Sequence, residues 1–324
     1  MHDCPIEGWA ASGHMARSLL VCLCLAGCAG GGVAGAGCSV PPITTLALHI
    51  DRGFILAPAV IEGRSVEVVV DTGAAVTSIS TGAMLALHLA PDTHRRLTVR
   101  GAGGESKADH AAVERFIVGG LKLVSPAFPI VAIPFASSVA LNPAAILGSD
   151  WMSQFDVDFD LPGGTARFYP PGRCAAPPWA GPSTAAPLRV VDGLPHIAVK
   201  VDDTPIDALL DSGASSSTLA AAMAVRLGMT PAEFLEPPAG RSLSTDGRLR
   251  QSWVHQFRRL EIAETEFANP RLLVSELNVA RTSLLFGVDW LRKHRIWLSY
   301  GARQLKVLDG PPRPKTAAID ALHP

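Results

Sequence analysis

Residues 65–74 read SVEVVVDTGA, and residues 204–214 repeat the pattern as TPIDALLDSGA. In both copies a largely apolar run ends at an aspartate, which is followed by a hydroxyl residue and a glycine. Apolar runs of this length that end at turn residues are typical of strands buried on both faces. We therefore expect two equivalent buried strands, each with an aspartate at its end.

A second motif is also repeated. Residues 145–152 read AILGSDWM, and residues 284–291 read LLFGVDWL. The glycine of this second motif lies 75 residues after the D-T-G glycine in the first half and 74 residues after the D-S-G glycine in the second. Two different motifs that recur at matched spacing indicate that the chain contains two copies of one structural unit.

The rest of each half favours strands. Residues 155–169 and 296–308 alternate between apolar and polar side chains, a pattern that predicts β-hairpins. The chain has 30 Gly, 26 Pro and only 6% aromatic residues, which suits short strands and turns. Helical signal is confined to residues 81–89 and 219–227, where alanine is frequent in the second segment. The predicted fold is all-β with few short helices, in which two pseudo-symmetric β-barrel lobes form an intrachain pseudo-dimer.

Composition places the boundaries between these units. Residues 170–187 contain six prolines, which is typical of a linker. We expect an N-terminal lobe at 48–172, a Pro-rich linker at 173–187, a C-terminal lobe at 188–310 and a tail at 311–324.

The N-terminus carries an export pattern. Residues 19–26 form a short apolar run behind Arg17, as in a signal peptide. Residues 25–28, LAGC, resemble the bacterial lipobox, in which the cysteine becomes the lipidated first residue of the mature protein. We expect a signal peptide at 1–27 with translation starting at Met15.

This reading predicts an exported lipoprotein, anchored to the membrane through Cys28 and facing the bacterial periplasm, with a tether at 28–47. There are two alternatives: a plain secretory signal, and an uncleaved membrane anchor over residues 19–40. After Cys28 the chain has only two more cysteines, Cys38 and Cys174. Because disulfides persist in exported proteins, we expect a bond between them.

Several function classes are excluded by the sequence. With 28 Lys and Arg against 29 Asp and Glu, the net charge is −1, so no basic field is present to bind nucleic acid. Residues 30–35 fit G-x-G-x-x-G, but residues 37–42 cannot begin the helix that a phosphate site needs. The ten histidines form no H-E-x-x-H motif and have no cysteines at metal spacing. We expect neither a cofactor nor a metal ion.

With both motifs repeated, residues 50–310 resemble the retropepsin-like aspartic proteases, in the bacterial single-chain form that carries both active-site motifs in one polypeptide. The resemblance rests on Asp71-Thr72-Gly73-Ala74, on Asp211-Ser212-Gly213-Ala214 and on the segments ending at Gly148 and Gly287. It implies retropepsin-like lobes, with Asp71 and Asp211 as the catalytic residues.

The same resemblance implies supporting roles for other residues. The hydroxyls of Thr72 and Ser212 would bond across the lobe interface, next to Gly73 and Gly213 in the active-site loops, and Gly148 and Gly287 would lie in the crossed ψ-structure behind those loops. A flap hairpin is expected in each lobe, at Gly101, Gly103 and Gly104 and at Asp246 and Gly247. Neither flap contains the tyrosine of pepsin-like enzymes, since the only tyrosines are Tyr169 and Tyr300.

The implied function is that of an aspartic endopeptidase. Two adjacent carboxyls hold one shared proton, and together they activate a water that hydrolyses a peptide bond. The expected partner is a protein or peptide substrate, and the chain is expected to work as a monomer. The alternatives are an inactive peptide-binding module on a protease fold and another hydrolase that uses the same carboxylates.

Asp150 and Asp289 form a second repeated carboxylate pair, which could in principle cleave glycosides. Each stands at an expected helix start, so N-capping explains it more simply. Trp151 and Trp290, the residues that follow, are expected in the core.

Overall fold

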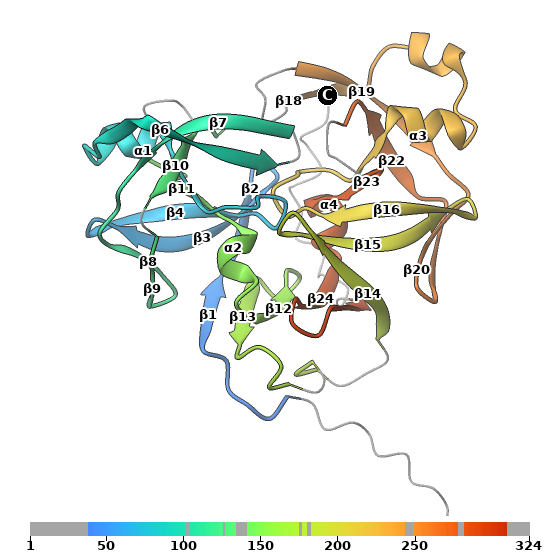
Figure 1. Ribbon diagram of the computed structural model, residues 1–324. Coiled ribbons are helices and arrows are strands. Elements are labelled where there is room, and N and C mark those ends of the chain that lie inside the picture. The colour runs from blue at the N-terminus through green and yellow to red at the C-terminus, as the bar shows by residue number, and fades with distance from the viewer. Residues whose placement is uncertain are drawn as a thin grey trace, which may run out of the picture. The chain divides into compact units, whose positions relative to one another are not determined.

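The computed structural model describes residues 38–309, except 102–103, 126, 134–140, 175–176, 180–182, 244–248 and 278–281. Strands dominate the described residues, and the helices are short (Figure 1). The prediction of an all-β fold with two similar lobes is therefore confirmed. Within the described residues, no helix is both long and apolar enough to cross a membrane.

The N-terminal lobe is built on one curled sheet. Its strands follow the order β6-β7-β10-β5-β11-β4-β3-β8-β9, and β2 pairs with β3. The bounds are β2 (His49–Asp51), β3 (Phe54–Ile61), β4 (Arg64–Val70), β5 (Ser78–Ser80), β6 (Pro91–Gly101), β7 (Gly104–Ala111), β8 (Phe116–Val118), β9 (Leu121–Leu123), β10 (Phe128–Val131) and β11 (Ala145–Leu147). Helix α1 (Thr81–Ala86) follows β5, and α2 (Ser149–Met152) follows β11.

The C-terminal lobe repeats this plan. Its strands follow the order β15-β16-β23-β17-β22-β19-β18, and β20 pairs with both β15 and β21. The bounds are β15 (Leu194–Val201), β16 (Thr204–Leu210), β17 (Thr218–Ala220), β18 (Gly240–Leu243), β19 (Leu249–Gln256), β20 (Arg259–Ile262), β21 (Thr265–Ala268), β22 (Arg271–Ser275), β23 (Leu284–Phe286), α3 (Ala221–Arg226), α4 (Val288–Leu291) and the 3-10 helix η1 (Pro231–Leu235).

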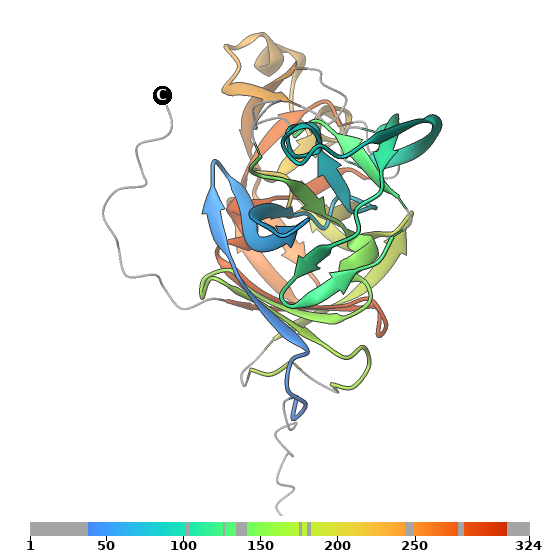
Figure 2. The same cartoon turned by 90° about the vertical axis from the view of Figure 1, so that its left-hand side faces the viewer.

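A further run of strands joins the two halves, in the order β1-β13-β12-β24-β25-β14 (Figure 2). The bounds are β1 (Thr44–Ala47), β12 (Asp156–Asp160), β13 (Thr165–Tyr169), β14 (Thr184–Val191), β24 (His294–Ser299) and β25 (Gln304–Asp309). At its centre β12 of the first half pairs antiparallel with β24 of the second, with Asp158 opposite Trp297. The closing hairpins of the two halves therefore form one shared sheet.

Two expected boundaries are wrong by a few residues. Residues 44–47, assigned to the tether, form β1 and pair with β13. Residues 184–187, assigned to the linker, form the start of β14 and pair with β25. Both segments are held by strands far away in the sequence, which local composition does not reveal. A disulfide joins Cys38, before β1, to Cys174, after β13.

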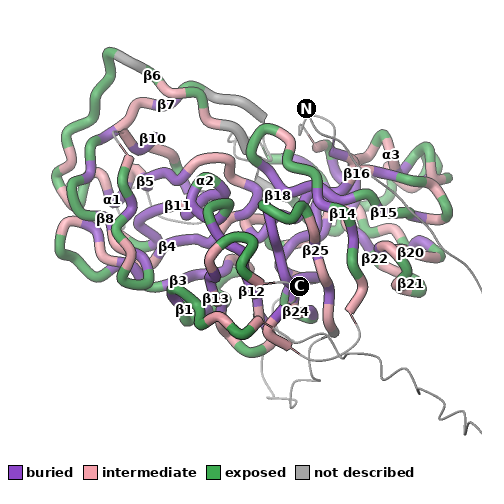
Figure 3. Tube along the Cα trace, turned by 60° about the horizontal axis from the view of Figure 1, so that its bottom comes forward, coloured by how far each residue is buried: buried purple, intermediate pink, exposed green. Residues whose placement is uncertain are grey.

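One large apolar core fills the molecule, and the strands that lead to the two aspartates, β4 and β16, are largely buried in it (Figure 3). Trp151 and Trp290 are 6% and 9% exposed, so their predicted core position is confirmed.

A buried ion pair fixes the shared sheet. Asp158 is fully buried in β12 and accepts hydrogen bonds from Arg295 of β24, at 2.8 Å from Nε and 2.7 Å from Nη2. Arg167 of β13 donates a further bond from Nη1, at 3.2 Å. Arg295 also lies 4.9 Å over the ring of Trp179.

Arg295→Ala is expected to destabilise the protein by about 2–4 kcal/mol, because it leaves a buried carboxylate with only one of its two cationic partners. The midpoint of chemical denaturation measures this loss. The control is Lys293→Ala, which changes an exposed side chain two residues away. Equal midpoints for the two variants would show that the ion pair contributes nothing to stability.

Candidate active site

The chain brings Asp71 and Asp211 together at the ends of β4 and β16. In each lobe the second motif anchors the aspartate: the N–H of Asp71 donates to Leu147 O at 3.0 Å, and the N–H of Asp211 donates to Phe286 O at 2.9 Å. These carbonyls belong to the parallel neighbours β11 and β23. The two copies of the repeated sequence thus hold their aspartates in the same way.

Each carboxyl lies against the loop of the other lobe. The N–H of Gly73 donates to Asp71 Oδ1 at 2.8 Å, and that of Gly213 donates to Asp211 Oδ1 at 3.0 Å. A Cβ atom on Gly73 would collide with the carboxyl of Asp211, and one on Gly213 would collide with that of Asp71. The motif therefore needs glycine because the opposite carboxyl occupies the space of a side chain.

Hydroxyl groups lock the two loops together. Thr72 Oγ1 donates to Leu210 O at 2.6 Å and accepts from the Ser212 N–H at 3.0 Å. Ser212 Oγ donates to Val70 O at 2.7 Å and accepts from the Thr72 N–H at 2.9 Å. Each hydroxyl thus bonds the backbone of the other lobe, and these groups are buried. The distance between the aspartates is consequently set by four buried hydrogen bonds.

Gly148 and Gly287 lie directly behind the loops. The Gly148 N–H donates to Thr77 Oγ1 at 3.0 Å, and the Gly287 N–H donates to Ser217 Oγ at 3.1 Å. A Cβ atom on Gly148 would collide with the backbone at Val76. The glycine in this motif permits close packing against the loop that follows each aspartate.

The N-cap interpretation of Asp150 and Asp289 is wrong. The N-cap residues of α2 and α4 are the preceding glycines. Instead, Asp150 Oδ1 accepts from the N–H and the hydroxyl of Thr77, at 2.9 and 2.7 Å, and Asp289 Oδ1 accepts from the same groups of Ser217, both at 2.7 Å. This second carboxylate pair links each helix to the loop that follows the D-[ST]-G motif of its lobe.

Ser149 and Tyr300 support the site but were not expected from the sequence. Ser149 Oγ donates to Thr72 O at 2.8 Å and lies 3.1 Å from the hydroxyl of Tyr300, which comes from the other half of the chain. Both residues are buried, and burial raises the pKa of Tyr300. The corresponding residue in the second motif is Val288, so a polar residue at one of two equivalent buried positions was the available signal.

The flap residues are only partly described. Gly101 pairs with Gly104 at the end of the β6–β7 hairpin, and β18 pairs with β19 up to Leu243 and Leu249. Gly103, Asp246 and Gly247 lie outside the described residues, as does Cys28.

The surroundings of both aspartates disfavour ionisation. Asp211 is 2% exposed, whereas Asp71 is half-buried. Burial raises the pKa of Asp71 to about 6, against the opposing effect of the Gly73 N–H. Burial, and next the charge of Asp71, raise the pKa of Asp211 well above its ordinary value. Two such carboxyls in contact hold a proton between them at a pH where isolated aspartates have lost theirs.

The described residues contain no group of three or more His, Cys, Asp or Glu that could hold a metal ion. The site is made of two carboxyls, backbone N–H groups and hydroxyls. Such an arrangement can move protons to and from a bound water.

Comparison with known proteins identifies the repeated unit. The family model described as "Aspartyl protease" matches residues 57–151 and residues 197–290, which together make up more than half of the chain. Each match contains one D-[ST]-G loop and one second motif. A search of curated proteins finds no match for this chain. The chain therefore belongs to the retropepsin-like aspartyl protease family, with one copy of the family's domain in each half.

Proposed function

We propose that this protein is an aspartic endopeptidase, which hydrolyses peptide bonds with a water activated between Asp71 and Asp211. The observation that carries the proposal is the contact between two carboxyls, one from each lobe, each held by the backbone of its own loop. That of Asp211 is buried and that of Asp71 is half-buried. Because one chain supplies both aspartates, it would work as a monomer. The expected substrate is a protein or peptide.

In this mechanism the ionised aspartate takes a proton from the water as the water oxygen attacks the carbonyl carbon of the scissile bond. The protonated aspartate donates a hydrogen bond to the carbonyl oxygen, which stabilises the negative charge that develops there. When the tetrahedral intermediate collapses, the C–N bond breaks and a proton passes to the leaving amine. The two aspartates finish with one proton between them, ready for the next cycle.

We also propose that the protein is exported and anchored at the membrane through a lipidated Cys28. Support comes from the signal-like residues 19–28 and from the Cys38–Cys174 disulfide, a bond that persists in oxidising compartments.

The dependence of rate on pH tests the endopeptidase proposal. A pair with both protons has no base, and a pair with none has no acid, so only the singly protonated pair works. Since burial raises both pKa values, and that of Asp71 to about 6, we expect the rate to rise as the pH increases through about 6 and to fall again at higher pH.

The measurement is the release of peptides from an unfolded, reduced protein across the pH range over which the enzyme stays folded. Absence of cleavage at every pH would favour an inactive peptide-binding module. Cleavage with a rate that does not fall on the basic side would contradict the shared proton.

A further inference from the structure

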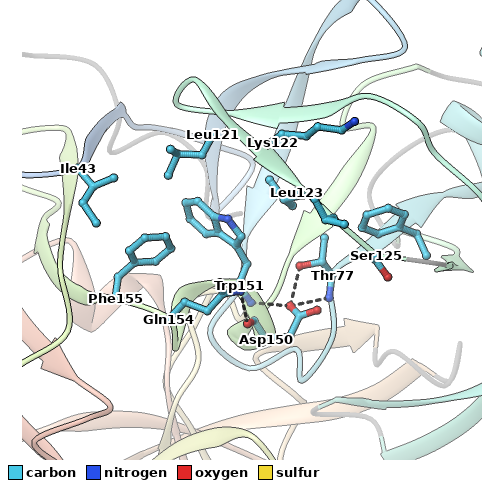
Figure 4. A pocket seen from close by; sticks show the side chains of 12 residues that line it. Ile43, Thr77, Leu121, Lys122, Leu123, Ser125, Asp150, Trp151, Gln154 and Phe155 are labelled. Atoms are coloured by element: carbon cyan, nitrogen blue, oxygen red, sulfur yellow. Dashed lines mark hydrogen bonds between the residues drawn. The ribbon is translucent and has the colours of Figure 1, made fainter.

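A pocket of about 400 Å³ lies in the N-terminal lobe, and neither Asp71 nor Asp211 is among the residues that line it (Figure 4). It is bounded by β9, by helix α2 and the residues that follow it, and by Ile43 in front of β1. Leu121, Trp151 and Phe155 give it a largely apolar wall. Pockets of this volume, mostly apolar with a few polar groups, are typical of binding sites.

One wall of the pocket is an edge strand. In the described part of the chain, β9 pairs only with β8 and ends the sheet. Residues 121–125 line the pocket without interruption, so the pocket follows the strand along its length. An edge strand presents backbone N–H and C=O groups that an extended peptide can pair with, and an adjacent pocket selects the side chain that enters it.

Exposed apolar side chains lie at this pocket. Val124 is 88% exposed and Ile43 is 46% exposed, and both line it. Side chains of this kind gathered beside a pocket are typical of a surface that a partner covers. Contact with an apolar side chain would remove both from water.

The indole of Trp151 supplies a polar group inside the pocket. Its side chain is 6% exposed and lies at the centre of the pocket in Figure 4. Within the described residues, no hydrogen bond involves its indole N–H; the Trp151 bond drawn there is donated by the backbone. An indole N–H that is accessible to solvent, as this one is, can donate to the carbonyl group of a bound peptide.

In the C-terminal lobe, the side chain of Phe267 occupies the place that corresponds to this pocket. Leu123 of β9 and Phe267 of β21 occupy equivalent positions in the two hairpins. The ring of Phe267 lies 6.5 Å from that of Trp290 and 5.6 Å from that of His294. The smaller Leu123 leaves the space beside Trp151 open.

We propose that this pocket binds an extended peptide segment, which adds as a strand beside β9 and inserts one large apolar side chain next to Trp151. The binding itself does not require catalysis. The peptide would be part of a substrate, held at this second site while Asp71 and Asp211 hydrolyse a bond in another part of it. This last step rests on the proposed function.

Binding is measured with the full chain carrying Asp211→Asn, so that turnover plays no part. The probe is a capped peptide of threonines with one central leucine. We expect Val124→Lys to weaken its Kd about tenfold or more, because a charge replaces an apolar contact. Exchange of the central leucine for serine should have a similar effect. The matched control is Ala268→Lys, which changes the exposed residue after Phe267 in the other lobe and should leave Kd unchanged.

Amide hydrogen exchange then locates the site. Bound peptide is expected to slow exchange in residues 121–124. The proposal is overturned if the leucine peptide does not bind, if Val124→Lys and Ala268→Lys bind it equally, or if protection is confined to the loop around Asp71. An inactive wild-type enzyme that still binds the peptide at β9 would overturn the proposed function and leave this site standing.

Discussion

Asp211→Asn is expected to lower kcat/KM by several orders of magnitude, since the loss of one member of a catalytic unit removes nearly all of its effect. The fold should survive, because the asparagine Oδ1 can still accept from the Gly213 N–H, which lies 3.0 Å from the carboxyl oxygen. The measurement is cleavage of a peptide substrate per folded molecule.

The same variant should be more stable than the wild type at neutral pH. The pKa of Asp211 is raised in the folded state, so the folded protein binds a proton more tightly than the unfolded chain. Stability of the wild type therefore falls as the pH rises from the ordinary carboxyl pKa toward the raised one. Asparagine does not titrate, so we expect the variant to gain stability over the wild type at about pH 7 and the gain to disappear near pH 3.

Asp289→Asn is the matched control for this experiment. Its Oδ1 can still accept from Ser217, as the carboxyl does at 2.7 Å, and the rate per folded molecule should stay close to that of the wild type. A folded Asp211→Asn protein that cleaves at the wild-type rate would remove Asp211 from the mechanism. A folded but inactive Asp289→Asn protein would move the chemistry to the second carboxylate pair.

Gly73→Ala is expected to reduce the rate on the order of a hundredfold or more, because a displacement of about 1 Å at a reacting group has that effect. The added Cβ has no room beside the carboxyl of Asp211, so one loop must move away from the other. The move also strains the hydrogen bonds between Thr72 and Ser212 that hold the loops, and the melting temperature should fall as well.

Gly301→Ala serves as the control, since a Cβ at that position meets nothing within 4 Å. Rate and melting temperature should match the wild type. If Gly73→Ala keeps full activity, the two carboxyls do not lie against the opposite loops as described.

The fold class could be predicted because its signals are local. The apolar runs before Asp71 and Asp211 form the buried strands β4 and β16, and the second motif follows at matched spacing in each half. The repeat itself supplied the two-lobe plan. Turn residues at the ends of these runs then placed the aspartates at strand ends.

What local patterns could not give was the pairing between distant segments. Strand β1 is held by β13, more than a hundred residues further along the chain, and β12 finds its partner in β24. Apolar and polar residues alternate in these segments, as expected for strands. This pattern does not show which strand each one pairs with. The segment 44–47 therefore looked like part of a tether.

In the candidate site, too, local features could be predicted and contacts between distant residues could not. The spacing of Asp71 and Asp211 within the repeats was enough to pair them. The sequence pattern predicts a helix cap at Asp150, but the groups that donate to its carboxylate lie across the fold, at Thr77. The N-cap position is occupied by Gly148. The bond between Ser149 and Tyr300 spans the two halves, and only the three-dimensional arrangement reveals it.

The most direct test of the two-aspartate site is the digestion of a peptide library by the wild type beside Asp71→Asn, at equal concentrations of folded protein and near the pH of highest rate. Mass spectrometry of the products locates each new terminus. We expect internal cleavage of peptide bonds by the wild type and none above background by the variant. An identical set of cleavage products from both proteins, formed at the same rate, would contradict a mechanism in which Asp71 and Asp211 act together.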